Sequence, residues 1–473
     1  MSTINAAGGE RPPWEALPFN GAVRAVAVAA AIFAIAFLGY YLSQYLADDD
    51  FPASGSAWAK VSGGWCEKDS TSRDCWYKHY VYQAEAMLHG SLDLAKAGVP
   101  DYYQDLVRRA DGKVFLPYQP APAVVMLPFV AIWGTGFSEL YFSMIIGAIN
   151  VVLLWYLLGL MNVSLRTRLL MAPFFAFGTA NFYSSTTGTL WFYNHVVAVM
   201  FLLLAIIFLL RRANPLVPAF FLGAAFMSRQ AMILALPFFL YWMVRQTYPR
   251  VFTMETVRQV MRDREILLKA GAFCAALVPF VALSLWYNAA RFGGVFETGL
   301  TELYDSYGGV PYSFYLTKNF CLSQDCTALP DPTRFDMLDL RNIPLHLYTI
   351  FLLPPQFVGG WDVFRPSWYG MSVLLTSPPF IFAFLVKRDD PLKVACWLAI
   401  PLVAIPTLLY YSQGWVQFGY RYLMDYVPFL LILTALGFED NRSPAGTRWM
   451  VALVAVSVLA GFWGRYWGSK LGW

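Results

Sequence analysis

Long apolar runs separated by short polar segments cover most of the chain. Most of the runs approach the roughly 20 residues that an α-helix needs to cross the hydrocarbon of a bilayer. They cover residues 23–46, 140–161, 169–184, 196–210, 216–227, 231–244, 267–286, 372–386, 394–411, 422–437 and 449–463. The pattern predicts an all-α, polytopic transmembrane helical bundle with about 11–13 spans.

Two shorter apolar segments do not fit this alternation of spans and loops. Residues 120–133 cannot form a lone full span without reversing the loops that follow, so we interpret them as a half-helix or a tight hairpin. Residues 343–353 pose the same problem, and we expect them to lie along the membrane surface.

A different spacing occurs in the first long polar segment, within residues 76–94. Apolar or aromatic residues recur there three and four positions apart, at Tyr77, Tyr80, Val81, Ala84, Met87 and Leu88. This spacing predicts an amphipathic helix on the membrane surface, with its apolar face against lipid or the bundle. Asp74 precedes the helix, where a carboxylate would cap the free backbone N–H groups.

Composition excludes a soluble protein. Of 473 residues, 58% are hydrophobic and 14% are charged, and the mean hydropathy is +0.48, whereas a soluble domain keeps about a quarter of its residues charged. The first apolar run is long for a signal peptide and lacks a small-residue cleavage site, so we interpret it as an uncleaved anchor. Lys and Arg form short clusters between apolar runs, so we expect a lipid bilayer as partner and no nucleic acid.

The basic clusters predict the orientation, because Lys and Arg collect in the cytoplasmic loops of membrane proteins. Such clusters occur at residues 166–168, 211–212, 245–269, 387–388 and 442–448. The predicted division is a cytoplasmic N-terminus 1–22, a first transmembrane helix 23–46, a first extracytoplasmic loop 47–120, transmembrane helices 121–287, a second long extracytoplasmic loop 288–370 and C-terminal transmembrane helices 371–473. We therefore expect a multi-pass protein of the cell membrane, with any active site on the extracytoplasmic (periplasmic) side.

Two pairs of cysteines fall in the loops assigned to the outside. Cys66 and Cys75 lie in the first loop, and Cys321 and Cys326 lie in the second. Close pairs in an oxidising compartment predict two disulfides. The alternatives are four free thiols or a zinc site, although neither pair has the CxxC spacing of zinc ligands.

Several segments of the sequence carry a family resemblance. The segments are AEAMLHGSLDL, DGKVFLPYQPAPAVVMLPFVAIWG, GTLWFYNHVVAV, FLGAAFMSRQAMILALPFF and GWVQFGYRYLMDYVPFL. Together they resemble the polytopic glycosyltransferases of the GT-C superfamily, in particular bacterial members of the glycosyltransferase-39 type that are related to protein O-mannosyltransferases and lipid A aminoarabinose transferases. The chain departs from those members where they place an Asp-Glu pair before the surface helix, because it has Asp74-Cys75-Trp76 there.

The resemblance implies a defined reaction. A sugar passes from a polyprenyl-phosphate donor to a lipid, glycan or protein acceptor on the outer face of the membrane, usually with inversion. Such a reaction requires a carboxylate to take the proton of the acceptor hydroxyl and cationic groups to stabilise the departing phosphate. The chain has neither GxxxxGK[ST] nor GxGxxG, and a pre-activated donor requires no nucleotide site. We expect no cofactor, with a divalent metal as an open alternative.

The candidates for the catalytic base are three acids of the first outer loop. Asp74 ranks first because it lies just before the surface helix, and Asp105 in YYQDLVRRADGK ranks second because the resemblance also places an acid there. Glu85 lies on the surface helix itself. For each of them the alternative is a hydrated loop acid, and Asp74 is fully explained as a helix cap.

Arg229 is the sharpest candidate for binding the donor phosphate. It interrupts the apolar residues 216–244, where a charge is costly unless it is paired or faces water. The planar guanidinium fork can bond two phosphate oxygens at once, and the resemblance implies a Lys or Arg in this turn near the phosphate. The alternative is an arginine whose side chain extends to the membrane interface.

The remaining candidates for substrate binding lie at the predicted outer ends of spans or in the first loop. Arg421 and Tyr420 occur in GYRY, where Arg421 could instead pair with Asp425 four residues later. His195 and Asn194, beside Trp191, would suit a sugar ring, although a lone histidine is often a structural hydrogen-bonding group. His79, on the predicted surface helix, is a further candidate.

Two other classes of function compete with the enzyme. A transporter or a lipid or glycan flippase would place ionisable residues near the middle of its spans, whereas these charges gather in loops and at span ends. A membrane scaffold without catalysis would not require the long outer loop with its acids.

Overall fold

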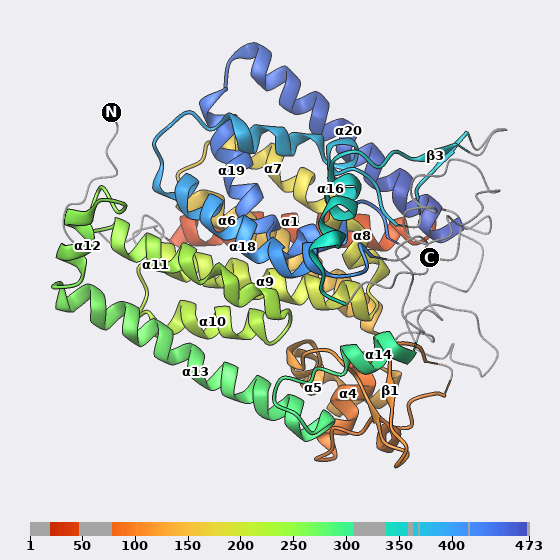
Figure 1. Cartoon of the computed structure of the whole chain (residues 1–473). Helices are drawn as coiled ribbons and strands as arrows, with labels where there is room; N and C mark the ends of the chain where they lie inside the picture. The colour runs from red at the N-terminus through yellow and green to blue at the C-terminus, as the bar shows by residue number, and fades with distance from the viewer. Residues whose placement is uncertain are drawn as a thin grey trace.

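The computed structural model describes residues 19–46, 78–101, 103–306, 337–357, 363–367, 369–414 and 417–470. In these residues the protein is an all-α helical bundle, as predicted (Figure 1). The strands of the described part form two-residue antiparallel hairpins. They are β1 (Val107–Arg108) with β2 (Val114–Phe115), and β3 (Gln356–Phe357) with β4 (Phe364–Arg365).

Six helices of the described part are long and apolar enough to cross a membrane, and each coincides with a predicted run. They are α1 (Phe19–Ser43), α6 (Glu139–Leu160), α9 (Leu190–Leu210), α13 (Arg264–Phe292), α18 (Pro391–Leu409) and α20 (Pro444–Lys470). Several apolar helices of this length support a multi-pass membrane protein.

The other five predicted runs form shorter helices. They are α7 (Leu165–Phe177) with α8 (Ala180–Thr187), α10 (Leu216–Phe226), the 3₁₀ helix η3 (Gln230–Ala235) with α11 (Leu236–Arg245), α17 (Val373–Thr376) with the 3₁₀ helix η5 (Pro378–Leu385), and the 3₁₀ helix η6 (Arg421–Asp425) with α19 (Val427–Asp440). Gly178 ends α7, and Pro237, Pro378 and Pro428 lie in the first turn of the segments that follow the other breaks. Proline suits a helix start because its missing N–H has no intrahelical acceptor there.

The two ambiguous segments also form single short helices. Residues 120–133 give α5 (Ala121–Trp133), followed by the 3₁₀ turn η2 (Gly134–Gly136), so the half-helix interpretation describes them better than the hairpin. Residues 343–353 give α16 (Ile343–Phe351), preceded by the 3₁₀ turn η4 (Leu340–Asn342). The charge-rich stretch 245–269 contains the short helix α12 (Met254–Val260) and the start of α13.

The predicted surface helix is present as α4 (His79–Leu88), shorter than the predicted 76–94. Tyr80, Val81 and Ala84 are fully buried, and they pack against Met126 of α5 and Val196 of α9. The apolar face of α4 therefore rests on the bundle. A short 3₁₀ helix, η1 (Leu94–Ala97), and the β1–β2 hairpin complete the described part of this loop.

Helix α19 forms the centre of the largest hydrophobic cluster. Every residue of α19 from Val427 to Phe438 is buried, and its side chains pack among those of α7, α9, α11 and α18. A helix that is apolar on all sides belongs in the interior of a bundle. The sequence of α19 thus accounts for its position.

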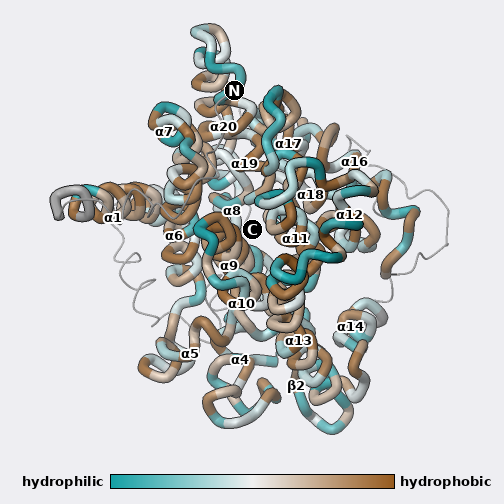
Figure 2. Tube along the Cα trace, turned by 90° about the vertical axis from the view of Figure 1, so that its left-hand side faces the viewer, coloured by the Kyte–Doolittle hydropathy of each residue, from teal (hydrophilic) through white to brown (hydrophobic). Residues whose placement is uncertain are grey.

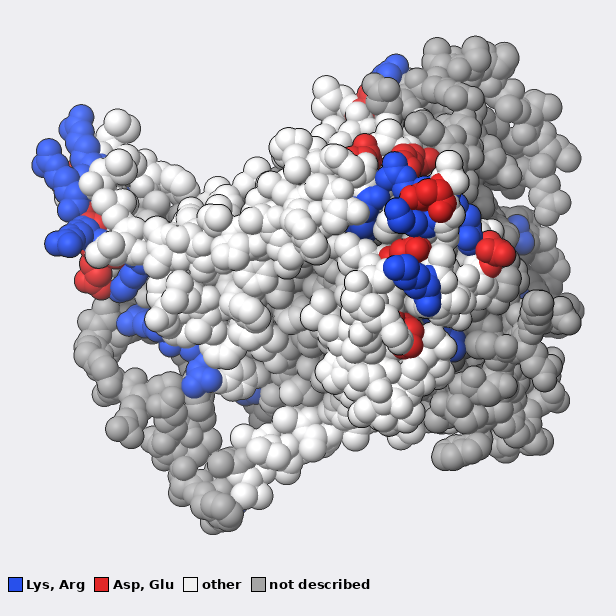
Figure 3. Space-filling view, turned by 90° about the horizontal axis from the view of Figure 1, so that it is seen from below, with Lys and Arg blue, Asp and Glu red and all other residues white. Residues whose placement is uncertain are grey.

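The two ends of the bundle carry different segments. Figure 1 shows α12 at one end, and α4, β1, α14 (Leu300–Ser306) and α16 toward the other. The view of the α12 end shows hydrophilic segments near α12 and a largely hydrophobic α1 at the side (Figure 2). From below, Lys and Arg gather at the α12 end, acids and bases mix at the opposite end, and a surface without charged residues lies between them (Figure 3). Such a belt suits a bilayer.

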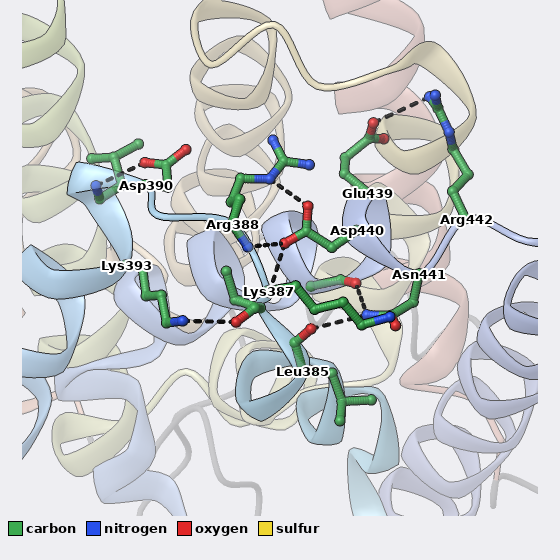
Figure 4. Close-up of polar contacts among 12 residues, drawn as sticks. Leu385, Lys387, Arg388, Asp390, Lys393, Glu439, Asp440, Asn441 and Arg442 are labelled. Atoms are coloured by element: carbon green, nitrogen blue, oxygen red, sulfur yellow. Dashed lines mark hydrogen bonds and ion pairs between the residues drawn. The ribbon is translucent and has the colours of Figure 1, made fainter. Parts of the chain in front are cut away.

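A network of polar contacts joins residues 385–393 to the end of α19, on the side that the basic clusters assign to the cytoplasm (Figure 4). The carboxylate of Asp440, at the end of α19, accepts hydrogen bonds from the backbone N–H groups of Lys387 and Arg388 and from the Arg388 side chain. The neighbouring Glu439 accepts from Ser164 and Thr167 at the start of α7. These contacts of Glu439 and Asp440 tie the end of α19 to α7 and to residues 387–388.

Candidate active site

Arg229 lies in the break between α10 and η3. Its backbone N–H closes the last turn of α10 onto Ala225, and its carbonyl accepts from Met232 in η3. Its extended backbone separates the two helices, so its side chain can leave the helix axis. The carbonyl of Met227 in the same turn accepts a hydrogen bond of 2.9 Å from the backbone N–H of Ala121. The start of α5 is thereby tied to the Arg229 turn.

Arg229, Asp425 and His195 form a buried triad. The Nε and Nη2 atoms of Arg229 donate to the two oxygens of Asp425 at 3.1 and 2.8 Å. The Nδ1 atom of His195 lies 2.8 Å from Oδ1 of Asp425. The side chains of His195 and Asp425 are 1% and 0% exposed, whereas that of Arg229 is 18% exposed. Of the three side chains, that of Arg229 therefore has the most accessible surface.

Arg421 contacts the same tyrosine ring as Arg229 of the triad. The Cζ atoms of Arg421 and Arg229 lie 5.2 and 5.6 Å from the ring centroid of Tyr422, within the range of cation–π contact. The spacing in the sequence suggested Arg421 as a partner of Asp425, but the hydrogen bonds of Asp425 come from Arg229 and His195. Two guanidinium groups thus contact the Tyr422 ring, and that of Arg229 is also paired with Asp425.

The rings of Tyr420 and His346 pack against the ring of Tyr422. The Nε2 atom of His346 lies 2.8 Å from the backbone carbonyl of Tyr410, which can only accept, so Nε2 carries the proton. Nδ1 is then free to accept from the hydroxyl of Tyr420 at 2.9 Å. His346 is fully buried, and both its ring and that of Tyr420 contact Tyr422. Tyr420, predicted to bind substrate, is 1% exposed and forms part of this support.

Burial gives the stability of the protein a pH dependence at His346. Burial lowers the pKa of His346 from 6.5 to about 4, so the unfolded chain binds a proton that the folded chain excludes. The free energy of unfolding should be constant and highest above pH 6.5. It should fall by about 3 kcal/mol as the pH drops toward 4, and it should become constant again below that pH. Thermal unfolding between pH 4 and 7.5 measures this. The His346→Gln variant should show a shallower fall over that range, and equal slopes for both proteins would contradict the assignment.

Asp105 is the loop acid that lies close enough to Tyr118 and Tyr411 to affect their pKa values. It has a left-handed backbone with φ of 57°, which is rare for a residue other than glycine. Burial raises the pKa of the Tyr118 hydroxyl, the carboxylate of Asp105 raises it further, and the positive charge of Arg421 opposes that rise. The pKa of Tyr411 is raised to about 12, mainly because that tyrosine is buried. The negative charge of Asp105 adds to the rise. Asp105 and Arg421 thus act on the same hydroxyl group.

Two interactions fix the loop around Asp105 and Tyr118. The Nε2 atom of His79, the first residue of α4, lies 2.8 Å from the carbonyl of Gln104, the residue before Asp105. The guanidinium of Arg291, buried at the end of α13, donates to the carbonyls of Leu116 and Tyr118. His79, predicted to bind substrate, is buried and holds the loop of the acid.

Helix α4 also connects this loop to the triad. The N–H of Tyr80 donates to the carboxylate of Glu139 at 3.0 Å, which ties the start of α4 to the start of α6. Burial raises the pKa of Tyr80, the negative charge of Glu139 raises it further, and the nearby positive charge of Arg229 lowers it. Asn194, which is buried next to His195, lies close enough to the hydroxyl of Tyr80 to lower its pKa slightly. Asn194 therefore faces α4.

The other predicted site residues fall elsewhere. Glu85 lies near the end of α4, where its carboxylate is 3.7 Å from Nδ1 of the exposed His89. Asp74 and the cysteines Cys66, Cys75, Cys321 and Cys326 lie outside the described residues. The two cysteines of the described part, Cys274 and Cys396, are free thiols. In the same part of the chain no three His, Cys, Asp or Glu side chains form a group that could hold a metal ion.

Sequence reasoning missed Asp425 as the partner of Arg229. Asp425 interrupts the apolar run 422–437 just as Arg229 interrupts 216–244, so the same signal marks both residues. It also missed the supporting residues Tyr118, Arg291 and His346, which are ordinary in type and acquire their roles through contacts across the sequence. Nothing in their local sequence distinguishes them.

Comparisons with known proteins add one structural likeness. No family model matches the chain, and no curated protein matches it. Among solved structures, the chain is similar to the oligosaccharyltransferase of Archaeoglobus fulgidus, whose crystal structure has a tethered acceptor peptide containing the NVT sequon. The TM-score is 0.44, the sequence identity is 14%, and the match covers 94% of this chain and 55% of that one. The chain spans about half the length of that protein.

Proposed function

We propose that the chain is a GT-C-type membrane glycosyltransferase. It moves a sugar from a polyprenyl-phosphate donor to a hydroxyl of a glycan, lipid or protein acceptor. The observation that carries the proposal is the arrangement of Arg229 and Arg421 around Tyr422. Asp105 and Arg421 both lie close enough to Tyr118 to affect its pKa, in opposite directions. An acid and two cations at one end of an apolar bundle are the groups that this transfer requires. The resemblance of the sequence motifs supports the same class.

The transfer follows from those groups. Asp105 takes the proton of the acceptor hydroxyl, whose oxygen attacks the anomeric carbon from the face opposite the phosphate. The bond between the anomeric carbon and the phosphate oxygen breaks, and its electron pair remains on the phosphate. The leaving phosphate therefore gains negative charge, and the configuration at the anomeric carbon inverts. Arg229 and Arg421 stabilise that charge in a site of low dielectric.

The cations around Tyr422 suit an anionic donor. The guanidinium groups of Arg229 and Arg421 both lie within cation–π range of the Tyr422 ring. A phosphate diester carries one negative charge, and a planar guanidinium can bond two of its oxygens at once.

Apolar surface beside the arginines suits a prenyl chain. Helix α5 begins at Ala121, which is bonded to the Arg229 turn, and along its length it exposes Val124, Ile132 and Trp133. A prenyl chain lying along α5 would keep its phosphate near Arg229 while its carbons remain in lipid.

The basic clusters support an extracytoplasmic site. Helix α9 runs from His195, near its start, to the predicted cytoplasmic pair Arg211 and Arg212, which follow its end. Its 21 residues correspond to roughly 30 Å, about the thickness of the hydrocarbon core. If Arg211 and Arg212 are cytoplasmic, the triad faces the outside.

The test is release of sugar from a labelled donor. The purified full-length protein is supplied with a panel of radiolabelled polyprenyl-phosphate sugars, and we expect slow transfer to water and faster transfer to an acceptor. Arg421→Gln should lower the rate by about 10²-fold or more, because one charge that stabilises the phosphate is removed. Arg258→Gln is the matched control, since Arg258 is exposed on α12 at the opposite end. A parallel reaction with a chelator tests for a divalent metal.

Two outcomes would contradict the proposal. One is a wild-type protein that binds the lipids of the panel without releasing sugar from any of them. The other is movement of intact labelled lipid between the leaflets of a vesicle without release, which would favour a flippase.

A further inference from the structure

Asp425 has a feature that phosphate binding by Arg229 alone does not explain. Its carboxylate is fully buried, and it is shared between Arg229 and His195. We infer that His195 and Asp425 are positioning residues, which fix the guanidinium of Arg229 for the donor phosphate. The inference rests on the proposed function, because it explains how Arg229, a proposed phosphate-binding residue, is held in position.

The hydrogen-bonding capacity of the three groups determines their roles. The guanidinium of Arg229 can only donate hydrogen bonds. Its Nε–Nη2 edge donates to the two oxygens of Asp425. The planar fork therefore cannot present that edge to a phosphate. The Nη1 atom and the second hydrogen of Nη2 belong to the opposite part of the group, and they remain for a ligand. Asp425 thus selects which side of the guanidinium meets the donor.

His195 in turn fixes Asp425. Asp425 is fully buried beside the positive charge of Arg229, and an ionised carboxylate can only accept, so Nδ1 of His195 is the donor in the 2.8 Å contact. Oδ1 then receives two donors and Oδ2 receives one. A carboxylate held by two side chains from different parts of the chain cannot rotate without losing a hydrogen bond in the interior, where an unpaired polar group is costly. The plane of the Arg229 fork is set by this carboxylate.

The second nitrogen of His195 shows how the residue acts. Nε2 is buried and has no hydrogen-bond partner among the residues that the structure describes. The polar contribution of the imidazole therefore passes through Nδ1 to Asp425 alone. A side chain with a donor at the position of Nδ1 should replace histidine, and one with its donor at the position of Nε2 should not.

The three residues come from separate parts of the fold. His195 lies on α9, Arg229 in the turn after α10, and Asp425 at the end of η6 directly before the buried helix α19. Rigid helices thus define the geometry of the triad, and the flexible arginine side chain is ordered before the donor arrives. A group that is already fixed loses less freedom on binding, so it binds more tightly.

The test compares two amides at one position. Asparagine places its NH₂ near the position of Nδ1, and glutamine places it near that of Nε2. We expect His195→Asn to keep the donor KM within about threefold of the wild type, and His195→Gln to raise it about tenfold or more, with a smaller change in kcat. Thermal unfolding confirms that both variants are folded. The same two changes at His89, which is exposed at the end of α4, are the control and should leave KM unchanged.

The outcomes separate this inference from the proposed function. If the wild type neither transfers nor releases sugar, the proposed function fails. If the wild type is active, and the folded asparagine and glutamine variants share one donor KM, the positioning role is overturned. A direct measurement of binding with a short polyprenyl phosphate should give the same order of affinities, with wild type and asparagine above glutamine. A reversed order would also overturn the role.

Discussion

Replacing Asp105 by asparagine is expected to lower the rate of sugar transfer by about 10²–10⁴-fold, the usual contribution of a general base. An amide cannot take the proton of the acceptor hydroxyl. Asparagine also tolerates the left-handed backbone that Asp105 adopts, so the loop should keep its course. The measurement is the transfer rate at saturating donor, and the donor KM should stay nearly unchanged because the carboxylate acts on the acceptor.

The control for this substitution is Asp111→Asn. Asp111 is an exposed acid of the β1–β2 hairpin that pairs with Lys113, and its loss should leave transfer unaffected. Full activity of Asp105→Asn would assign the base to another acid of the first loop. Glu85→Gln and Asp74→Asn would then be the variants to compare.

Replacing Asp425 by leucine should destabilise the protein by about 3–5 kcal/mol, because a buried ion pair loses one partner while the other charge stays behind. Arg229 and the Nδ1–H of His195 would both lose their acceptor. Unfolding by heat or by a denaturing detergent measures the change. The variant should also lose donor binding, since nothing would orient the guanidinium.

A double substitution separates stability from function. Arg229→Met with Asp425→Leu removes both charges and replaces them with apolar side chains, a change that is often neutral or stabilising for a buried pair. The double variant should therefore recover most of the stability lost in Asp425→Leu while remaining inactive. A double variant as unstable as the single one would contradict the view that an unpaired arginine causes the loss.

The fold class followed from the sequence because the length and composition of apolar runs decide whether a segment can be a membrane helix. Helices α1, α6, α9, α13, α18 and α20 lie where the runs predicted them. The segments around Gly178, Pro378 and Pro428 were predicted as single spans and form broken helices. Hydropathy alone does not distinguish a continuous helix from two apolar pieces joined at a glycine or proline.

The candidate site followed from the sequence in part. Arg229 was recognised because an isolated charge in an apolar run requires a partner. That partner, Asp425, is separated from Arg229 by 196 positions, and its spacing of four from Arg421 suggested a local pair instead. Local spacing predicts local contacts only when the segment is an α-helix, and residues 421–425 form a 3₁₀ helix in which that spacing does not bring side chains together.

Helix α19 links the two polar features of this molecule. The helix has 14 residues, Val427–Asp440, and is roughly 21 Å long. Asp425 lies just before its first residue, and the hydrogen-bonded Glu439 and Asp440 lie at its other end. Because α19 is buried along its length and hydrogen-bonded at its C-terminal end, it holds the carboxylate of Asp425 near its N-terminal end in a fixed position. In the proposed reaction, room for a lipid-linked sugar would then come from elements at the outside of the bundle such as α13, while Asp425 keeps its position.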